Sequence, residues 1–324
     1  NIMAYPFSKH VKLTRRNQKW INTIACDNSK PIYKLSPQEA RKVLENLQNK
    51  YPVDVKADIV DKTITTEEGD IEVRIVRPVN NTELLPVILY LHGGGWIMGD
   101  KNTHNILISE LANKTNAVII FPQYTRSPEA GYPVALNQSY GVLDYIYNHP
   151  EEFNIDKDRI AIAGDSAGAN MATVLTMKVK ENNGPYILIQ ALFYPVTSAD
   201  MNTQSYKDFK DGPWLTKKAM EWFWNAYAPE QYMRDEPYIS PLNADIKLLN
   251  NLPPALIITA ENDVLRDEGE EYARKLDNAG VPVLNVRFNG TMHDFMMLHA
   301  LHNTEESTNA ILLASQVLKT ALHK

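Results

Sequence analysis

The residues with the clearest chemical potential form the segment Gly164-Asp165-Ser166-Ala167-Gly168. A serine with a glycine two residues to either side fits a sharp turn that exposes the hydroxyl, because the glycines let neighbouring backbone approach closely. At average glycine usage this pattern arises by chance in about one chain in ten of this length. Ser166 is therefore a candidate nucleophile whose surroundings must support it.

A second motif, His92-Gly93-Gly94-Gly95, is more specific, since chance produces it in under about 1% of such chains. Three successive glycines leave their backbone N–H groups free to point at one place, where they stabilise the negative oxygen that forms when a carbonyl is attacked. We expect Gly93 and Gly94 to form this oxyanion hole together with Ala167, the residue after the nucleophile. The alternative is a flexible glycine turn with His92 packed locally.

A serine hydroxyl becomes a good nucleophile only when a base takes its proton and an acid orients that base. After a nucleophile on such a turn, the acid and then the base follow along the chain, each in a loop beyond a strand end. His293 and Asp263 meet this requirement, because they follow the apolar runs 283–288 and 256–260. Glu261 and Asp267 lie near the same strand end and are the competing acids. We expect each of the other histidines to have a structural or solvated role.

These residues must be positioned by elements that the sequence also indicates. After Pro86, short apolar runs alternate with helical stretches, which is typical of a mostly parallel sheet covered by helices on both faces. We expect strands at 87–91, 117–121, 160–163, 187–194, 256–260 and 283–288, preceded by an antiparallel hairpin at 58–66 and 71–77. We expect helices at 133–148, 167–181, 266–279 and 304–322. Ser166 thus lies between a strand and a helix, the setting that its motif requires.

Two further regions should cover the catalytic domain, which we place at 51–196 and 252–324. Residues 1–50 look helical and form a predicted N-terminal cap segment, with Ser36 as the N-cap of one helix. Residues 197–251 interrupt the alternation and form a predicted cap insertion rich in aromatic residues, with a helix at 216–228. Its aromatic side chains either pack in the core or line a substrate pocket. We expect Trp96, Trp214 and Phe223 to contact substrate.

Composition narrows the class of protein. A formal net charge of −6 over 324 residues argues against a nucleic-acid-binding protein and favours a neutral or apolar small-molecule substrate. Cys26 is the only cysteine, so no intramolecular disulfide can form. The longest apolar runs are too short for a membrane-spanning helix, and the first ten residues lack a signal-peptide core. We expect a cytoplasmic location, unless an export signal has been removed ahead of Asn1.

The motifs together resemble the hormone-sensitive-lipase-like family of esterases, over about Val87 to the C-terminus. The resemblance also includes the segments 124–129, 194–195 and 263–268. It implies an α/β-hydrolase fold with an eight-stranded, mostly parallel sheet flanked by helices and a helical cap. It further implies hydrolysis of short- to medium-chain acyl esters by Ser166, His293 and Asp263, without a metal or organic cofactor, and a possible homodimer. The chain departs from the family pattern at 124–126, 137–138, Ala169 and Asp294, which affects packing and substrate fit more than the reaction.

Three alternatives stay open at the level of sequence. A non-catalytic ligand receptor could use the same scaffold, since a fold does not by itself establish chemistry. An amidase or peptidase could use the same three residues. An amine leaves only when it is protonated, so His293 would have to be positioned to donate a proton to the leaving nitrogen. A lipase acting at lipid surfaces would show a sharp rise in rate above the solubility limit of its substrate.

Overall fold

The computed structural model describes residues 5–324, and its centre is a single sheet of eight strands in the order β1-β2-β4-β3-β5-β6-β7-β8. The strands are β1 (Asp58–Thr66), β2 (Gly69–Arg77), β3 (Leu85–Leu91), β4 (Val118–Pro122), β5 (Ile155–Asp165), β6 (Ile187–Phe193), β7 (Ala255–Asn262) and β8 (Val283–Met292). β2 pairs antiparallel with β1 and β4, and all other neighbours are parallel. The predicted eight-stranded, mostly parallel sheet is confirmed.

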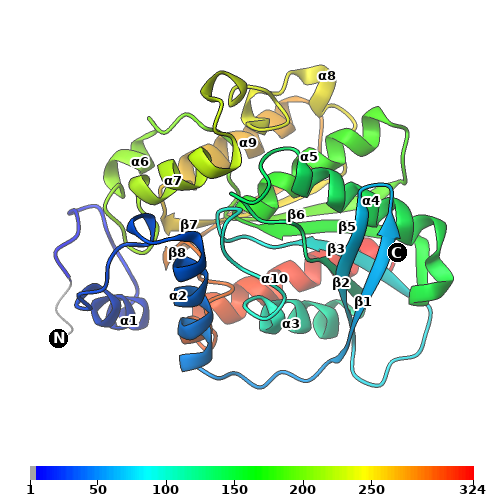
Figure 1. The fold of residues 1–324 in the computed structure, drawn as a ribbon, viewed down its shortest axis with the longest axis horizontal. Helices are drawn as coiled ribbons and strands as arrows, with labels where there is room; N and C mark the ends of the chain where they lie inside the picture. The colour runs from blue at the N-terminus through cyan, green and yellow to red at the C-terminus, as the bar shows by residue number, and fades with distance from the viewer. Residues whose placement is uncertain (1–4) are drawn as a thin grey trace.

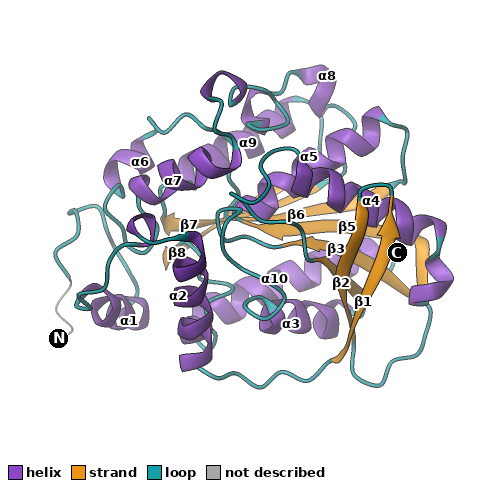
Figure 2. Cartoon of the chain, viewed as in Figure 1, coloured by secondary structure: helices purple, strands orange, loops and turns teal. Residues whose placement is uncertain are grey.

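Helices cover both faces of this sheet (Figures 1 and 2). One face carries α4 (Val134–Asn148), α5 (Ala167–Glu181) and α9 (Arg266–Asn278), and the other carries α3 (Asn105–Thr115) and α10 (Glu305–Leu322). The sequence pattern did not predict α3. Its buried residues, which include Ile106, Leu107, Ile108 and Leu111, are not confined to one face, so the helical period of apolar residues is weak.

The N-terminal segment and the first part of the insertion, residues 197–227, lie together near one end of the sheet, and α8 (Ile246–Leu249) lies apart from them (Figure 1). The N-terminal segment contains α1 (Arg15–Ala25) and α2 (Pro37–Lys50), and this part of the insertion contains α6 (Gln204–Asp208) and α7 (Lys217–Tyr227). They meet where the Ser8 hydroxyl donates to the Asp208 carbonyl at 2.8 Å and where the rings of Trp20 and Trp214 lie 5.5 Å apart. Residues 1–4 of the predicted cap segment are outside the described part of the chain.

Two helix starts show how the local sequence sets these elements. Ser36 accepts a hydrogen bond from the Glu39 N–H, and the Glu39 side chain accepts from the Ser36 N–H, which is the expected capping box of α2. Thr216 accepts from the Ala219 N–H at the start of α7.

Within residues 5–324, no helix combines the length and the apolar character needed to cross a bilayer.

Parallel pairing explains why the candidate residues meet. The carboxyl ends of parallel strands lie at one edge of a sheet, and each candidate follows such an end. His92 follows β3, Ser166 follows β5, Asp263 follows β7 and His293 follows β8. Leu91 pairs with Gly164 across β3 and β5, so the glycine loop and the serine turn are neighbours.

Candidate active site

Ser166 occupies a strained turn between β5 and α5. Its φ of 56° and ψ of −118° are unfavourable for a residue with a side chain, and such strain is typical of a nucleophile turn. The turn is held by the Ser166 N–H, which donates to the Phe193 carbonyl of β6 at 2.8 Å. A side chain at Gly168 would collide with the Leu91 carbonyl, so only glycine lets α5 approach β3 this closely.

A continuous chain of hydrogen bonds joins the three predicted catalytic residues. Ser166 Oγ lies 2.8 Å from His293 Nε2, and His293 Nδ1 lies 2.7 Å from Asp263 Oδ2. Asp263 is 1% exposed and also accepts the Leu265 N–H at 3.0 Å, which fixes its carboxylate. This is the geometry in which an imidazole can take a serine proton while a carboxylate fixes its tautomer.

The two competing acids are engaged elsewhere. Glu261 accepts the N–H of Gly290 at 2.7 Å, and Asp267 accepts the N–H of Ser205 at 2.8 Å. Asp267 also pairs with Arg266 at 3.0 Å. The structure therefore brings Asp263, and neither of its rivals, to the base.

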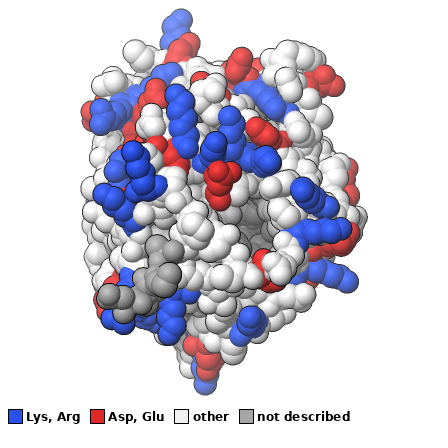
Figure 3. Space-filling model, turned by 90° about the vertical axis from the view of Figure 1, so that its left-hand side faces the viewer, with Lys and Arg blue, Asp and Glu red and all other residues white. Residues whose placement is uncertain are grey.

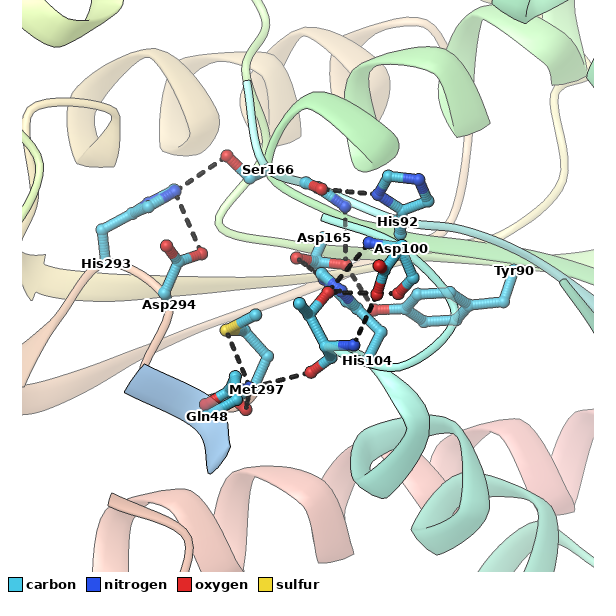
Figure 4. Close-up of polar contacts among 12 residues, drawn as sticks. Gln48, Tyr90, His92, Asp100, His104, Asp165, Ser166, His293, Asp294 and Met297 are labelled. Carbon is cyan, nitrogen blue, oxygen red and sulfur yellow. Dashed lines mark hydrogen bonds and ion pairs between the residues drawn. The ribbon is translucent and has the colours of Figure 1, made fainter. Parts of the chain in front are cut away.

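A second carboxylate approaches His293 from the side of the nucleophile (Figure 4). Asp294 Oδ1 lies 3.5 Å from His293 Nε2, while its Oδ2 accepts the indole N–H of Trp214 at 2.9 Å. Burial by itself lowers the pKa of His293, but the charges of Asp263 and Asp294 outweigh it and raise that pKa to about 9. Burial raises the pKa of Asp294. From the sequence, Asp294 stands out only as a departure from a common glycine. Its contacts with His293 and Trp214 place it in the site.

The glycine loop differs in one respect from the prediction. The Gly93 N–H donates to Asp165 Oδ1 at 3.1 Å and is therefore not free to bind a substrate oxygen. Among the described residues, the N–H groups of Gly94, Gly95 and Ala167 have no protein acceptor. The Gly93 N–H therefore does not fit the predicted oxyanion role, whereas the N–H groups of Gly94, Gly95 and Ala167 are available for it.

The three aromatic residues expected to contact substrate occupy different places. Trp96 is 1% exposed and stacks on Tyr227 of α7 at 4.1 Å, so it packs the glycine loop against the insertion. The ring of Phe223 lies directly against Gly95, where a side chain would strike it. Trp214 binds Asp294 through its indole N–H. Phe223 and Trp214 therefore border the candidate site, whereas Trp96 is buried against α7.

The site is almost closed by the segments around it. Ser166 is 5% exposed and His293 is 3% exposed. Figure 3 shows the side of the molecule toward which the strand ends of β7 and β8 point in Figure 1, and its surface is hollowed among mostly uncharged side chains with charged ones around them. In residues 5–324, no group of three His, Cys, Asp or Glu side chains is arranged to hold a metal ion.

The fold and the site together define an α/β hydrolase with a serine nucleophile, and comparisons with known proteins agree. A family model described as alpha/beta hydrolase fold matches residues 88–297, and the chain belongs to this family. The predicted resemblance to its hormone-sensitive-lipase-like esterases is confirmed.

Individual relatives point the same way. The chain is 34% identical to an esterase of Gibberella moniliformis, over 87% of this chain and 90% of that one. It is 32% identical to an ethyl acetate hydrolase of Pseudomonas putida, over 90% and 92% of the two chains. The crystal structure of a thermostable esterase from Pseudomonas putida superimposes with a TM-score of 0.95 at 41% identity and covers 99% of each chain.

Proposed function

We propose that this protein is a serine carboxylesterase that hydrolyses short- to medium-chain acyl esters. The observation that carries the proposal is the hydrogen-bonded chain from Ser166 through His293 to Asp263, with distances of 2.8 Å and 2.7 Å. The free N–H groups beside the serine add the second requirement for acyl transfer. The esterases and the ethyl acetate hydrolase among the relatives support the same reaction class.

In the first half of the reaction, His293 Nε2 takes the hydroxyl proton as Ser166 Oγ attacks the ester carbonyl carbon. The carbonyl electrons move onto oxygen, and the N–H groups of Gly94, Gly95 and Ala167 stabilise the resulting negative charge. The tetrahedral intermediate then expels the alcohol, which takes its proton from His293 Nε2. An acyl-serine remains. Water then attacks its carbonyl carbon while His293 takes the water proton, and the acid is released as Ser166 Oγ takes that proton back.

The surroundings of the serine favour a small substrate. The Phe223 ring against Gly95 and the contact of Trp214 with Asp294 limit the space over the catalytic groups. We place substrate entry at the hollow of Figure 3, on the side of the strand ends.

Formation of a homodimer, the absence of nucleic-acid partners and a cytoplasmic location stay predictions.

The decisive experiment measures hydrolysis of p-nitrophenyl esters from acetyl to dodecanoyl by the wild type and by Ser166→Ala, at matched concentration and pH. We expect the wild type to cleave the short chains and the variant to lose nearly all activity, because no other group replaces the nucleophile. Absence of cleavage by a folded wild type would contradict the proposal for simple esters. Faster cleavage of a matched anilide than of the ester would instead identify an amidase.

A further inference from the structure

A second histidine–aspartate pair lies behind the nucleophile, and the reaction described above does not use it. Asp165 immediately precedes Ser166, and its Oδ2 lies 3.0 Å from His104 Nε2. Both residues are at most 1% exposed. Figure 4 shows this pair and His293 on opposite sides of Ser166. A buried charged pair is costly to desolvate, so its presence beside the catalytic serine calls for a physical reason.

The carboxylate of Asp165 is fully occupied by donors from the chain. Its Oδ1 accepts the Tyr90 hydroxyl at 2.7 Å and the Gly93 N–H at 3.1 Å, while Oδ2 faces His104. His104 Nδ1 in turn lies 2.9 Å from the Thr103 hydroxyl. Neither nitrogen of His104 is left to act on substrate.

Asp165 and His104 each stabilise the charged form of the other. Burial opposes both charged forms, yet the contact with His104 lowers the pKa of Asp165, and the contact with Asp165 raises the pKa of His104. An ionised carboxylate accepts stronger hydrogen bonds than a neutral group does. The bond to the Gly93 N–H is therefore of the charge-assisted kind.

The contact with Gly93 is also close enough to fix the glycine loop. A side chain at Gly93 would approach Asp165 Oδ2 to 2.5 Å, so the carboxylate rests directly against this backbone. Asp165 thus holds both parts of the oxyanion site. Its main chain continues into Ser166 and Ala167, and its side chain holds the residue before Gly94.

We propose that Asp165 and His104 form a positioning pair that sets the oxyanion hole, by holding the glycine loop at a fixed place relative to the nucleophile turn. The inference rests on the proposed esterase function. Displacement of such donors by about 1 Å can cost on the order of 100-fold in rate, because they must meet the oxygen of the transition state. The pair acts through Gly94, Gly95 and Ala167 and does not touch substrate.

The test compares Asp165→Ala and Asp165→Asn with the wild type. Each is measured for kcat and KM on p-nitrophenyl butyrate and for inhibition by an alkyl trifluoromethyl ketone, whose addition to Ser166 creates a tetrahedral oxyanion. The corresponding methyl ketone serves as the ground-state ligand. Tyr272→Phe is the matched control, because it removes a buried hydrogen bond to Thr173 away from the glycine loop.

We expect Asp165→Ala to lower kcat by about 10- to 100-fold and to weaken binding of the trifluoromethyl ketone by a similar factor. KM and affinity for the methyl ketone should change less than about threefold, since neither depends on a formed oxyanion. Asp165→Asn should restore most of both losses, because its amide oxygen can accept the Gly93 N–H and its amide nitrogen can donate to a neutral His104. Tyr272→Phe should leave all four quantities near the wild type.

Two results would overturn the inference. One is an Asp165→Ala variant with wild-type kcat and ketone affinity. The other is a loss that appears only as a lower melting temperature or as a higher KM, which a merely structural pair would produce. If Asp165→Ala does not fold, His104→Ala tests the same point, with losses expected in the same two quantities. If the wild type cleaves no ester, the proposed function fails as well, and this outcome is distinct from failure of the pair alone.

Discussion

The two histidine–aspartate pairs that flank Ser166 are alike in type and burial but differ in what their second imidazole nitrogen meets. His293 Nε2 faces the hydroxyl of Ser166 at 2.8 Å, whereas His104 Nδ1 faces the hydroxyl of Thr103 at 2.9 Å. Ser166 lies on a strained turn beside free N–H groups, and the hydroxyl of Thr103 donates to the Asp100 carbonyl at 3.1 Å. The two pairs therefore differ in the hydroxyl that each imidazole faces, and the Ser166 hydroxyl is the one that lies on a strained turn after a strand.

The largest expected effect comes from making the same substitution in both pairs. Asp263→Asn should lower kcat/KM by about 10⁴-fold, because the amide favours the wrong tautomer of His293. Asp165→Asn should lower kcat/KM by less than about tenfold, since Asp165 positions hydrogen-bond donors and does not orient the base. Steady-state kinetics on p-nitrophenyl butyrate check the difference. Equal losses in the two variants would remove the distinction between the pairs.

The next effect concerns stability. His104→Ala should lower the free energy of unfolding by about 3 kcal/mol, because it leaves the buried Asp165 carboxylate without its cationic partner. His302→Ala is the control, since its pair with Glu110 at 3.0 Å is partly exposed and should contribute about 1 kcal/mol or less. Urea unfolding measures both. A smaller loss for His104→Ala than for His302→Ala would contradict an ionised Asp165–His104 pair.

A third prediction concerns the pH dependence of the catalytic pair. Only neutral His293 can take the Ser166 proton, so kcat/KM should rise with pH as this residue, with its pKa of about 9, loses its proton. Asp294→Asn removes a negative charge that favours the imidazolium. The pKa should fall, and the acid limb of the profile should move to lower pH by about one unit. An unchanged profile would show that Asp294 does not act on the base.

The smallest effect is expected at the contact between the insertion and Asp294. Trp214→Phe keeps an aromatic ring beside Trp20 but removes the indole N–H that donates to Asp294. We expect kcat/KM to fall by about threefold, the contribution of one hydrogen bond of moderate strength. Kinetics across the acyl-chain series would measure it. A loss of more than about 50-fold would mean that this contact holds the base in place.

Much of the site could be predicted because its signals are local. Ser166 follows an apolar run and precedes a helical pattern, and its neighbouring glycines fit only a tight turn. His293 and Asp263 were found because apolar runs locate strand ends, and parallel strands bring such ends together. The sequence favours Asp263 over Glu261 and Asp267, and in the structure the latter two contact Gly290, Ser205 and Arg266 and not the base.

The sequence by itself determined the class of fold, the candidate nucleophile and base, and the order of the elements that carry them, because short-range periodicity and glycine geometry encode these features. Only the tertiary structure decided that Gly93 is occupied, that Gly95 offers a free N–H and that His104 pairs with Asp165. Those facts depend on residues such as Asp165 and His104, 61 positions apart, whose contact arises from the packing of β3, β5 and the loop before α3. No local pattern records which of several buried polar groups will meet.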